Sequence, residues 1–274
     1  MMIFLFSQSR AVLIALEALT LMFVMTRIYD GASTLGALMV FIAGTVISVL
    51  GDGIYAGILH HRRLLILYSL MQPDPFIRIY EPLLACRWIP SNVRFTLTAY
   101  LSNGYAAKGD FSRARALLDH APQAGKRQAL NRDLILCSNR VSIALAEGAA
   151  AEAEKQLSHM ANHMASGRLN AKKCAAQQSI HASQTAQLHI LRKECRVADC
   201  DLLRAESKKP GSALRKTELN YFIGQAYVQL KQPSFASEYL NAASQGKDVY
   251  YGKLASSALK ALKNDQRPDG SSKK

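Results

Sequence analysis

The apolar residues of this chain are concentrated near its beginning. An apolar stretch starts at Ile3 and runs to Thr26, with Arg10 and Glu17 as its only charged residues. A helix of this length covers roughly 36 Å at about 1.5 Å per residue, and the hydrocarbon core of a membrane is about 30 Å thick. The pattern predicts a membrane-spanning helix over residues 11–26, which extends to Ile3 if the Arg10 side chain snorkels.

A second apolar run follows a short loop. It covers residues 35–50 and continues to Leu59, while the loop Arg27–Thr34 contains turn-forming residues. Two spans joined by such a loop predict a transmembrane helical hairpin. A cleaved signal peptide fits poorly, because no Lys or Arg precedes the apolar start at Ile3 and no A-x-A site follows it. A buried core hairpin of a soluble protein stays open as the alternative interpretation.

The positive charges predict the orientation of the hairpin. The loop offers Arg27, which is balanced by Asp30, whereas Leu59 is followed by two histidines and then by Arg62 and Arg63. The positive-inside rule places the loop outside and the basic flank in the cytosol. We therefore expect a two-span protein of a bacterial inner (plasma) membrane, with both termini and everything after Leu59 in the cytoplasm.

Two acidic residues and two pairs of small residues mark the predicted spans. Glu17 and Asp52 are candidates for a functional role, because an ionisable group inside a membrane is functional by default. A structural carboxyl group stays the alternative for Glu17, and water can reach Asp52 near the cytosolic interface. Gly44 with Ser48, and Gly53 with Gly57, form small-x-x-x-small pairs, which let two helices approach closely.

The composition changes after the second apolar run, and the boundaries follow from it. A short amphipathic helix interrupted by Pro82 precedes a long region of helix formers, and the chain ends in polar residues. We expect a transmembrane hairpin over residues 1–59 and a juxtamembrane linker with a short helix over 60–92. A helical repeat domain over 93–263 and a disordered tail over 264–274 follow.

Residues 98–122 resemble a tetratricopeptide repeat. Tyr105 takes the aromatic place of the first helix, Gly109 the turn, and Ala114 the small place of the second helix. Residues 220–243 match again, with Tyr227 and Ala236 at these places. The same number of residues separates the two tyrosines and the two alanines, so both units are in register.

Two degenerate copies fit between these units. Gly148 takes the turn of the first copy, and His189 takes the tyrosine place of the second, with Ala198 and Leu202 in its second helix. The resemblance implies an all-α fold, in which a tetratricopeptide-like α-solenoid follows the hairpin and a helix over 249–263 caps it. A generic helical bundle stays open as the alternative.

The resemblance also implies where a partner would bind. Ligand-facing positions of this family lie on the first helices, two residues before the tyrosine place and one turn earlier, and they line a concave groove. Capture of a C-terminal carboxylate is not expected, because Ala99 stands where the family's clamp has a lysine. Amides can both donate to and accept from a peptide backbone. The partner-binding residues expected here are Asn103, Ser142, Gln187, Tyr221 and Gln225.

The charge predicts a second surface. The formal net charge of the 274 residues is +14, and most basic clusters fall on second helices and loops. Such a domain beside an anionic leaflet is attracted by about 1 kcal/mol per well-placed basic residue. Nucleic acid is not expected as a partner, because aromatic platforms do not alternate with the basic residues. The membrane-surface residues expected here are Arg62, Arg63, Arg192, Lys193 and Arg196.

Signatures of catalysis are missing from the sequence. It contains neither a phosphate-binding loop nor a zinc-protease or serine-hydrolase motif, and the five cysteines follow no zinc spacing. We therefore expect no enzyme, metal or cofactor, and a membrane-anchored scaffold or adaptor that binds a protein or peptide partner. The alternative is a small subunit of a membrane transport or envelope-biogenesis complex in which the hairpin is functional. The sequence names neither the partner nor the oligomeric state.

Overall fold

The computed structural model describes residues 18–26, 28–29, 31, 34–86, 89–122, 129–166 and 169–265. Throughout these ranges the regular elements are helices, so the expected all-α class is confirmed for them. The chain divides into two compact units, unit 1 over Met1–Leu65 and unit 2 over Ile66–Lys274.

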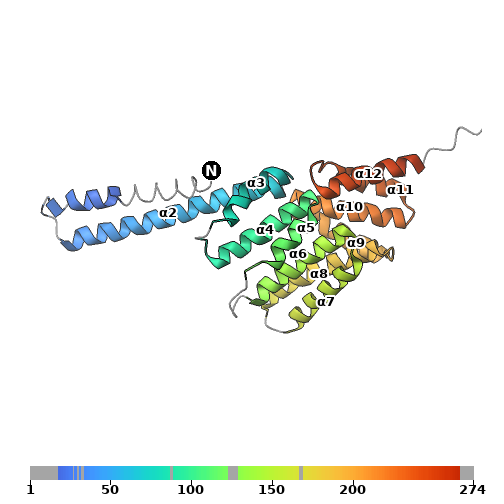
Figure 1. Cartoon of the computed structure of the whole chain (residues 1–274), viewed down its shortest axis with the longest axis horizontal. Helices are drawn as coiled ribbons and strands as arrows, with labels where there is room; N and C mark the ends of the chain where they lie inside the picture. The colour runs from blue at the N-terminus through green and yellow to red at the C-terminus, as the bar shows by residue number, and fades with distance from the viewer. Residues whose placement is uncertain are drawn as a thin grey trace, which may run out of the picture. The chain divides into compact units, whose positions relative to one another are not determined.

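Unit 1 contains two helices that lie side by side. Residues 18–26 form the first, and most of α2 (Thr34–Tyr68) forms the second (Figure 1). A methyl group added at Gly44 would collide with the side chain of Thr20. Gly44 therefore permits the close approach of the helices, as its small-residue pair predicted, whereas among the described residues a methyl group added at Gly57 would meet nothing within 4 Å.

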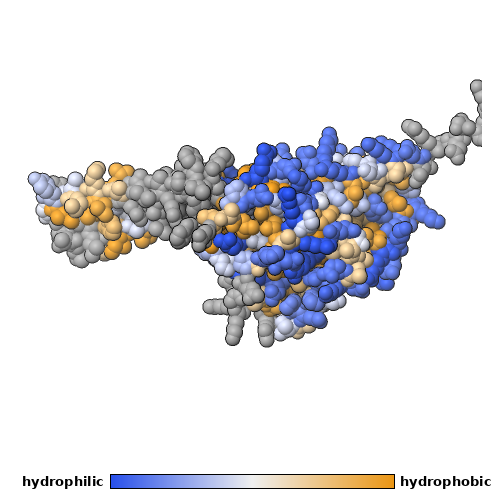
Figure 2. All heavy atoms as spheres, viewed as in Figure 1, coloured by the Kyte–Doolittle hydropathy of each residue, from blue (hydrophilic) through white to orange (hydrophobic). Residues whose placement is uncertain are grey.

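Apolar side chains cover the described surface of unit 1. Met22, Phe23, Ile42 and Val46 are each about half exposed or more. Figure 2 shows apolar patches on the described part of this unit. In the portion of the chain that the structure describes, no helix is both long enough and apolar enough to span a membrane.

Several of the predicted membrane features cannot be compared with the structure. The first predicted span is described only from residue 18 onward, and the side chains of residues 47–56 are not described. Glu17, Arg27, Asp30 and the side chain of Asp52 lie outside what is described, and so does the predicted tail after residue 265.

Unit 2 begins with a helix that the sequence assigned to a linker. Helix α3 (Pro73–Leu84) contains Pro82 and buries Phe76 and Tyr80 completely, with their rings stacked at 4.1 Å. A methyl group added at Gly104 would lie 2.8 Å from Cδ1 of Phe76, so α3 packs directly on the next helix. This segment is part of the core of unit 2.

Four antiparallel helix pairs follow and stack into a solenoid (Figure 1). Each second helix packs on the first helix of its own pair and on that of the next pair, and the first helices are neighbours of one another. The pairs are α4 (Ser91–Lys108) with α5 (Phe111–Asp119), α6 (Ala129–Glu147) with α7 (Ala150–Ala165), α8 (Ala171–Leu191) with α9 (Val197–Lys208), and α10 (Ala213–Gln229) with α11 (Pro233–Ser244).

The same turn ends the first helix of every pair. Gly109, Gly148, Lys193 and Lys231 have positive φ angles of 94°, 77°, 62° and 55°. The residue after each donates its N–H to the carbonyl group five residues earlier, over 2.8–2.9 Å. This is the Schellman pattern of a helix end. The first degenerate pair therefore turns at Gly148, as the sequence predicted, and lysine takes the turn position in the third and fourth pairs.

The small residues of the second helices fit this register except in the third pair. Ala114, Ala153 and Ala236 are fully buried against their first helices. In the third pair, Ala198 is exposed, and Leu203 is buried where the sequence predicted Leu202. The core positions predicted for α9 were therefore wrong, because the face that this helix buries is shifted by one residue.

The last helix, α12 (Tyr250–Asp265), packs on α10 and α11 and also reaches α4. The ring of Tyr250 lies 4.9 Å from that of Phe111, and its hydroxyl donates to the carbonyl oxygen of Ala146 over 2.9 Å. The chain therefore returns to its first two helix pairs, and α12 covers part of the concave face.

Candidate binding cavity

The concave face of unit 2 contains a cavity of about 290 Å³. All four first helices line it, together with the end of α2 and the start of α12. The start of α12 forms one side of this chamber, which is otherwise partly open to solvent. Its polar lining includes Asn103, Asn139, Ser142, Gln184, Arg215, Glu218 and Tyr251.

Two of the five predicted partner-binding residues line this cavity. Asn103 donates its side-chain amide to the hydroxyl of Tyr68 over 3.1 Å, and Ser142 accepts from Gln184 over 3.1 Å. Tyr68 and Gln184 line the cavity as well. The structure thus brings Asn103 and Ser142 together at the surface of one chamber.

The other three predicted residues lie outside the cavity lining. Gln187 is completely buried and donates to Glu218 over 3.2 Å. The ring of Tyr221 packs at 5.3 Å from that of Tyr251, and Gln225 is half-buried. Gln187 and Tyr221 therefore support residues that face the cavity, whereas Gln225 has no such role in the described contacts.

Gln184 is the most deeply placed polar residue of the lining, with 2% of its surface exposed. Its Nε2 donates to the backbone oxygen of Ser138 over 2.9 Å. A backbone oxygen can only accept, so this bond determines which way the amide is turned. The Oε1 atom then faces the opposite way, and within the described residues it has no hydrogen-bond partner.

Each charged residue of the cavity lining has an ion-pair partner. Arg215 donates to Glu218 over 2.7 Å and to the hydroxyl of Ser183 over 2.8 Å. Burial acts to lower the pKa of Arg215, but the charge and hydrogen bond of Glu218 outweigh it and raise the pKa. The cation is therefore retained. Glu206, on the other side of the chamber, pairs with Lys209 over 2.5 Å.

Two tyrosine hydroxyls at the cavity stay protonated. Burial raises the pKa of Tyr68 to about 12, although the hydrogen bond from Asn103 acts in the opposite direction. Burial also raises the pKa of Tyr251 well above its usual value, and the charge of Glu218 adds to this effect. Both side chains are neutral at physiological pH and can donate hydrogen bonds.

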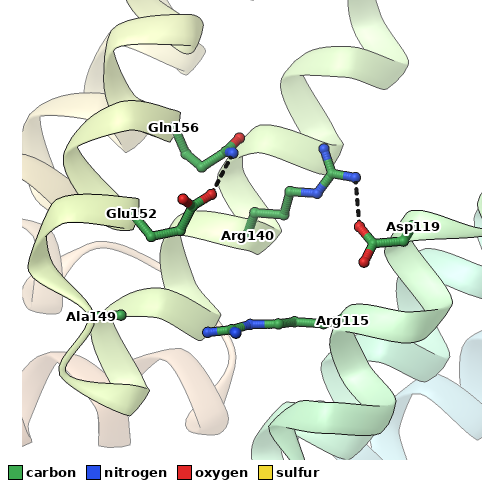
Figure 3. Close-up of a pocket in the computed structure, with 6 residues that line it drawn as sticks. All are labelled: Arg115, Asp119, Arg140, Ala149, Glu152 and Gln156. Atoms are coloured by element: carbon green, nitrogen blue, oxygen red, sulfur yellow. Dashed lines mark hydrogen bonds and ion pairs between the residues drawn. The ribbon is translucent and has the colours of Figure 1, made fainter.

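A larger cleft of about 440 Å³ lies between α5, α6 and α7. Figure 3 shows Arg115 extending from α5 toward Ala149, with Arg140 facing Asp119 across the gap. Arg115 also pairs with Glu147. These ion pairs join the first helix pair to the second, and because its cations are already paired, we interpret this cleft as a structural junction.

The predicted membrane-surface residues fall on both units. In unit 1, Arg62 is exposed and Arg63 is half-buried. In unit 2, Lys193 and Arg196 are exposed, whereas Arg192 makes a two-point ion pair with Glu154 at 2.5 and 3.3 Å. The positive charge of Arg192 is therefore partly compensated.

The possible metal ligands do not converge. Over the ranges that the structure describes, no group of three His, Cys, Asp or Glu side chains could hold a metal ion. All five cysteines are free thiols. Burial raises the pKa of Cys195 to about 11, and the charge of Asp199 contributes to this rise.

The sequence analysis missed several residues that line the cavity. They lie one or two turns earlier on the same helical faces as the predicted residues. Glu218 and Arg215 precede Tyr221 by about one and two turns, and Gln184 precedes Gln187 by one turn. An extension of the predicted stripe toward the start of each first helix would have found them. Tyr251 offered no such signal, because it reaches the cavity from α12.

Comparison of the chain with known proteins finds no matching family model, curated protein or solved structure. The proposals about the function of this chain therefore rest on its geometry.

Proposed function

We propose that this chain is a non-catalytic, membrane-anchored scaffold that binds a protein or peptide partner on the concave face of unit 2. The observation that carries the proposal is the solenoid itself, in which the first helices of all four pairs line one chamber with polar side chains. Stacked helix pairs of this kind generate concave binding surfaces.

The exposed apolar side chains of unit 1 support the anchor. About half or more of the surface is exposed on each of the residues Leu19, Met22, Ile42 and Val46. Apolar surface of this kind is unfavourable in water and favourable in lipid. The uninterrupted apolar sequence over residues 35–50 and the basic flank at Arg62 and Arg63 support the same proposal.

The basic residues of unit 2 would add an electrostatic contact with an anionic leaflet. Lys193 and Arg196 are the better donors of positive charge, because Glu154 already compensates Arg192. The contact would weaken with salt, since exposed charges are screened over about 8 Å at physiological ionic strength.

The small size of the chamber limits what a partner can insert. A volume of 290 Å³ is at the lower end of the sizes of ligand pockets. While α12 stays in place, a partner would insert only the tip of a segment, and a longer segment would need α12 to move. Asn103 and Ser142 are the predicted residues that such a tip would meet.

Crosslinking of the full chain in native membranes, followed by mass spectrometry, tests the partner proposal. We expect Asn103→Ala and Ser142→Ala to reduce recovery of one specific protein, and Lys193→Glu with Arg196→Glu to leave it unchanged. If the charge reversals abolish the crosslink while the cavity variants do nothing, the basic face is the binding surface and the proposal is wrong.

Extraction of membranes with alkaline carbonate tests the anchor. The full chain should stay in the membrane fraction, and Ile42→Arg with Val46→Arg should release it, because each arginine costs about 3 kcal/mol near the centre of a span. Val228→Arg, at an exposed apolar position of unit 2, is the matched control and should have no effect. A wild-type chain that carbonate extracts would contradict the anchor.

A further inference from the structure

The turn between α2 and α3 holds one apolar side chain out in solvent. Leu70 is 60% exposed, and the next residue, Met71, has a φ angle of 54°. Side chains other than glycine rarely adopt a positive φ. Met71 is anchored, because its Sδ accepts from Oγ1 of Thr217 over 3.2 Å, and a Cβ atom added at Gly246 would lie 3.2 Å from the same sulfur. The fold of unit 2 thus fixes Leu70 as an apolar tip.

Three basic side chains lie near Asp74, which follows Leu70 by four residues. Nζ of Lys108 pairs with the Asp74 carboxylate over 2.6 Å. This hydrogen bond lowers the pKa of Asp74, and the charges of Arg78 and Lys253 lower it further. All four side chains are exposed. One carboxylate therefore faces cations from α3, α4 and α12, and this Asp74 cluster has an excess of positive charge.

Further exposed charges flank the turn. Lys216 and Lys247 are each next in sequence to a residue that contacts Met71, and Asp248 adds one acid. Together with the Asp74 cluster, five basic residues stand against two acidic ones. The surface around the turn is therefore basic and carries an apolar tip.

The covalent chain keeps this surface close to the basic flank of the predicted span. Arg63 belongs to α2, which is helical up to Tyr68, and Leu70 follows two residues later. At about 1.5 Å per helical residue and at most about 3.5 Å per extended residue, the path from Arg63 to Leu70 is no longer than roughly 15 Å. In the proposed topology the span ends at the lipid headgroups, so the turn lies within reach of them.

An anionic leaflet matches both properties of this surface. Its headgroups attract basic residues beside the membrane, and apolar side chains favour the boundary between headgroups and acyl chains. A second copy of the chain is a poor match, because it carries the same net charge of +14 and like charges repel.

We propose that the α2–α3 turn and the Asp74 cluster form a docking surface for anionic phospholipids. Leu70 lies at the level of the headgroups, and the basic residues of the cluster contact their phosphate groups. Docking would hold unit 2 in one orientation on the leaflet. The inference rests on the membrane anchor of the proposed function and does not depend on the partner.

Photocrosslinking of the full chain in lipid vesicles tests the proposal. A photoreactive benzophenone amino acid replaces Leu70, or in the matched control Val228, another exposed apolar residue of unit 2. The vesicles contain phosphatidylcholine alone or an equal mixture with anionic phosphatidylglycerol, and mass spectrometry measures the lipid adducts.

We expect at least about threefold more lipid adducts at position 70 in the mixed vesicles than in phosphatidylcholine, because the attraction depends on anionic lipid. Position 228 should give few adducts in either. Equal yields at the two positions, equal yields in the two kinds of vesicle, or adducts of position 70 with protein instead of lipid would each overturn the proposal.

Charge reversal tests the residues of the cluster. Arg78→Glu with Lys253→Glu should reduce the lipid adducts at position 70 in mixed vesicles by at least about threefold. Lys155→Glu with Lys172→Glu, at exposed positions of α7 and α8, changes the net charge equally and should leave the yield unchanged. Equal losses in both variants would mean that net charge alone draws unit 2 to the leaflet, which contradicts a defined docking surface.

Salt provides a test that needs no charge variant. An increase in ionic strength from about 0.1 M to about 1 M shortens the screening distance from about 10 Å to about 3 Å. Adducts at position 70 should therefore fall in the mixed vesicles, and a yield that salt does not alter would refute the electrostatic contact.

The fate of the anchor can be read separately. A chain that carbonate extracts from the vesicles contradicts the anchor, and the docking surface with it. A chain that is retained but gives no charge-dependent adducts refutes the docking surface alone.

Discussion

Replacement of Gly224 by alanine tests how closely the last helix pair packs. Gly224 is buried in α10, and a Cβ atom added there would lie 2.6 Å from Cγ and 2.8 Å from Cδ2 of Leu240. Carbon atoms prefer to be about 3.5–4.0 Å apart. The backbone nitrogen of Leu240 would lie only 3.3 Å away, so a rotamer change alone does not make enough room and α11 has to shift.

Two opposing effects determine the result of Gly224→Ala. Alanine stabilises a helix interior by about 1 kcal/mol relative to glycine. Overpacking of a well-packed core costs about 1–3 kcal/mol. Because the added methyl group meets both a side chain and a backbone atom of α11, we expect overpacking to win, with a net loss of about 1 kcal/mol. For a unit of this size, such a loss lowers the melting temperature by about 2–4 °C.

Thermal unfolding of the full chain in micelles, followed by far-UV circular dichroism, measures this effect. Leu240→Ala alone should destabilise unit 2 by about 2–5 kcal/mol, because it leaves a cavity. The double variant should be more stable than the sum of the single effects predicts, by about 0.5–3 kcal/mol, since the new methyl group fills part of that cavity. A higher melting temperature for Gly224→Ala, or additive effects in the double variant, would refute the proposed packing.

Three further predictions follow from the packing and titration of unit 2. Ala114→Leu, at a fully buried place, should destabilise the protein by about 1–3 kcal/mol in a urea titration, whereas Ala116→Leu at an exposed place of the same helix should change little; equal midpoints would contradict the repeat packing. Alkylation of Cys195 by iodoacetamide should follow a pKa of about 11 in a peptide-mapping assay, and a midpoint near the usual thiol value of about 8.5 would show that this thiol is not shielded. The pKa of Tyr68 is about 12 in the folded state and about 10 when unfolded, so its contribution to stability is complete below pH 10 and is lost as the pH rises toward 12. Urea midpoints of Tyr68→Phe should therefore fall less steeply over this range than those of the wild type, and parallel slopes would argue against the shift.

The register of the helix pairs was predictable from the sequence because it depends on local interactions. A left-handed residue ends each first helix, and the Schellman bond that follows joins residues only five apart. Gly109 and Gly148 are recognisable at these places in the sequence, whereas the turn at Lys193 was seen only in the structure. The concave-facing positions Asn103 and Ser142 followed from the same register, since residues on one face of a helix recur every three or four positions.

The sequence by itself thus determined the helical class, the number of helix pairs in unit 2 and the turns at Gly109 and Gly148. The chamber on the concave face was decided by the tertiary structure. It depends on Tyr250 and Tyr251 packing against residues far away in the chain, and on Gly252, where any side chain would collide with the backbone of Gly246. The burial of Phe76 in α3 and the shifted face of α9 were decided in the same way. Contacts between distant segments leave no periodic signal in either segment, and only the assembled packing brings Gln184, Arg215 and Tyr251 around one space.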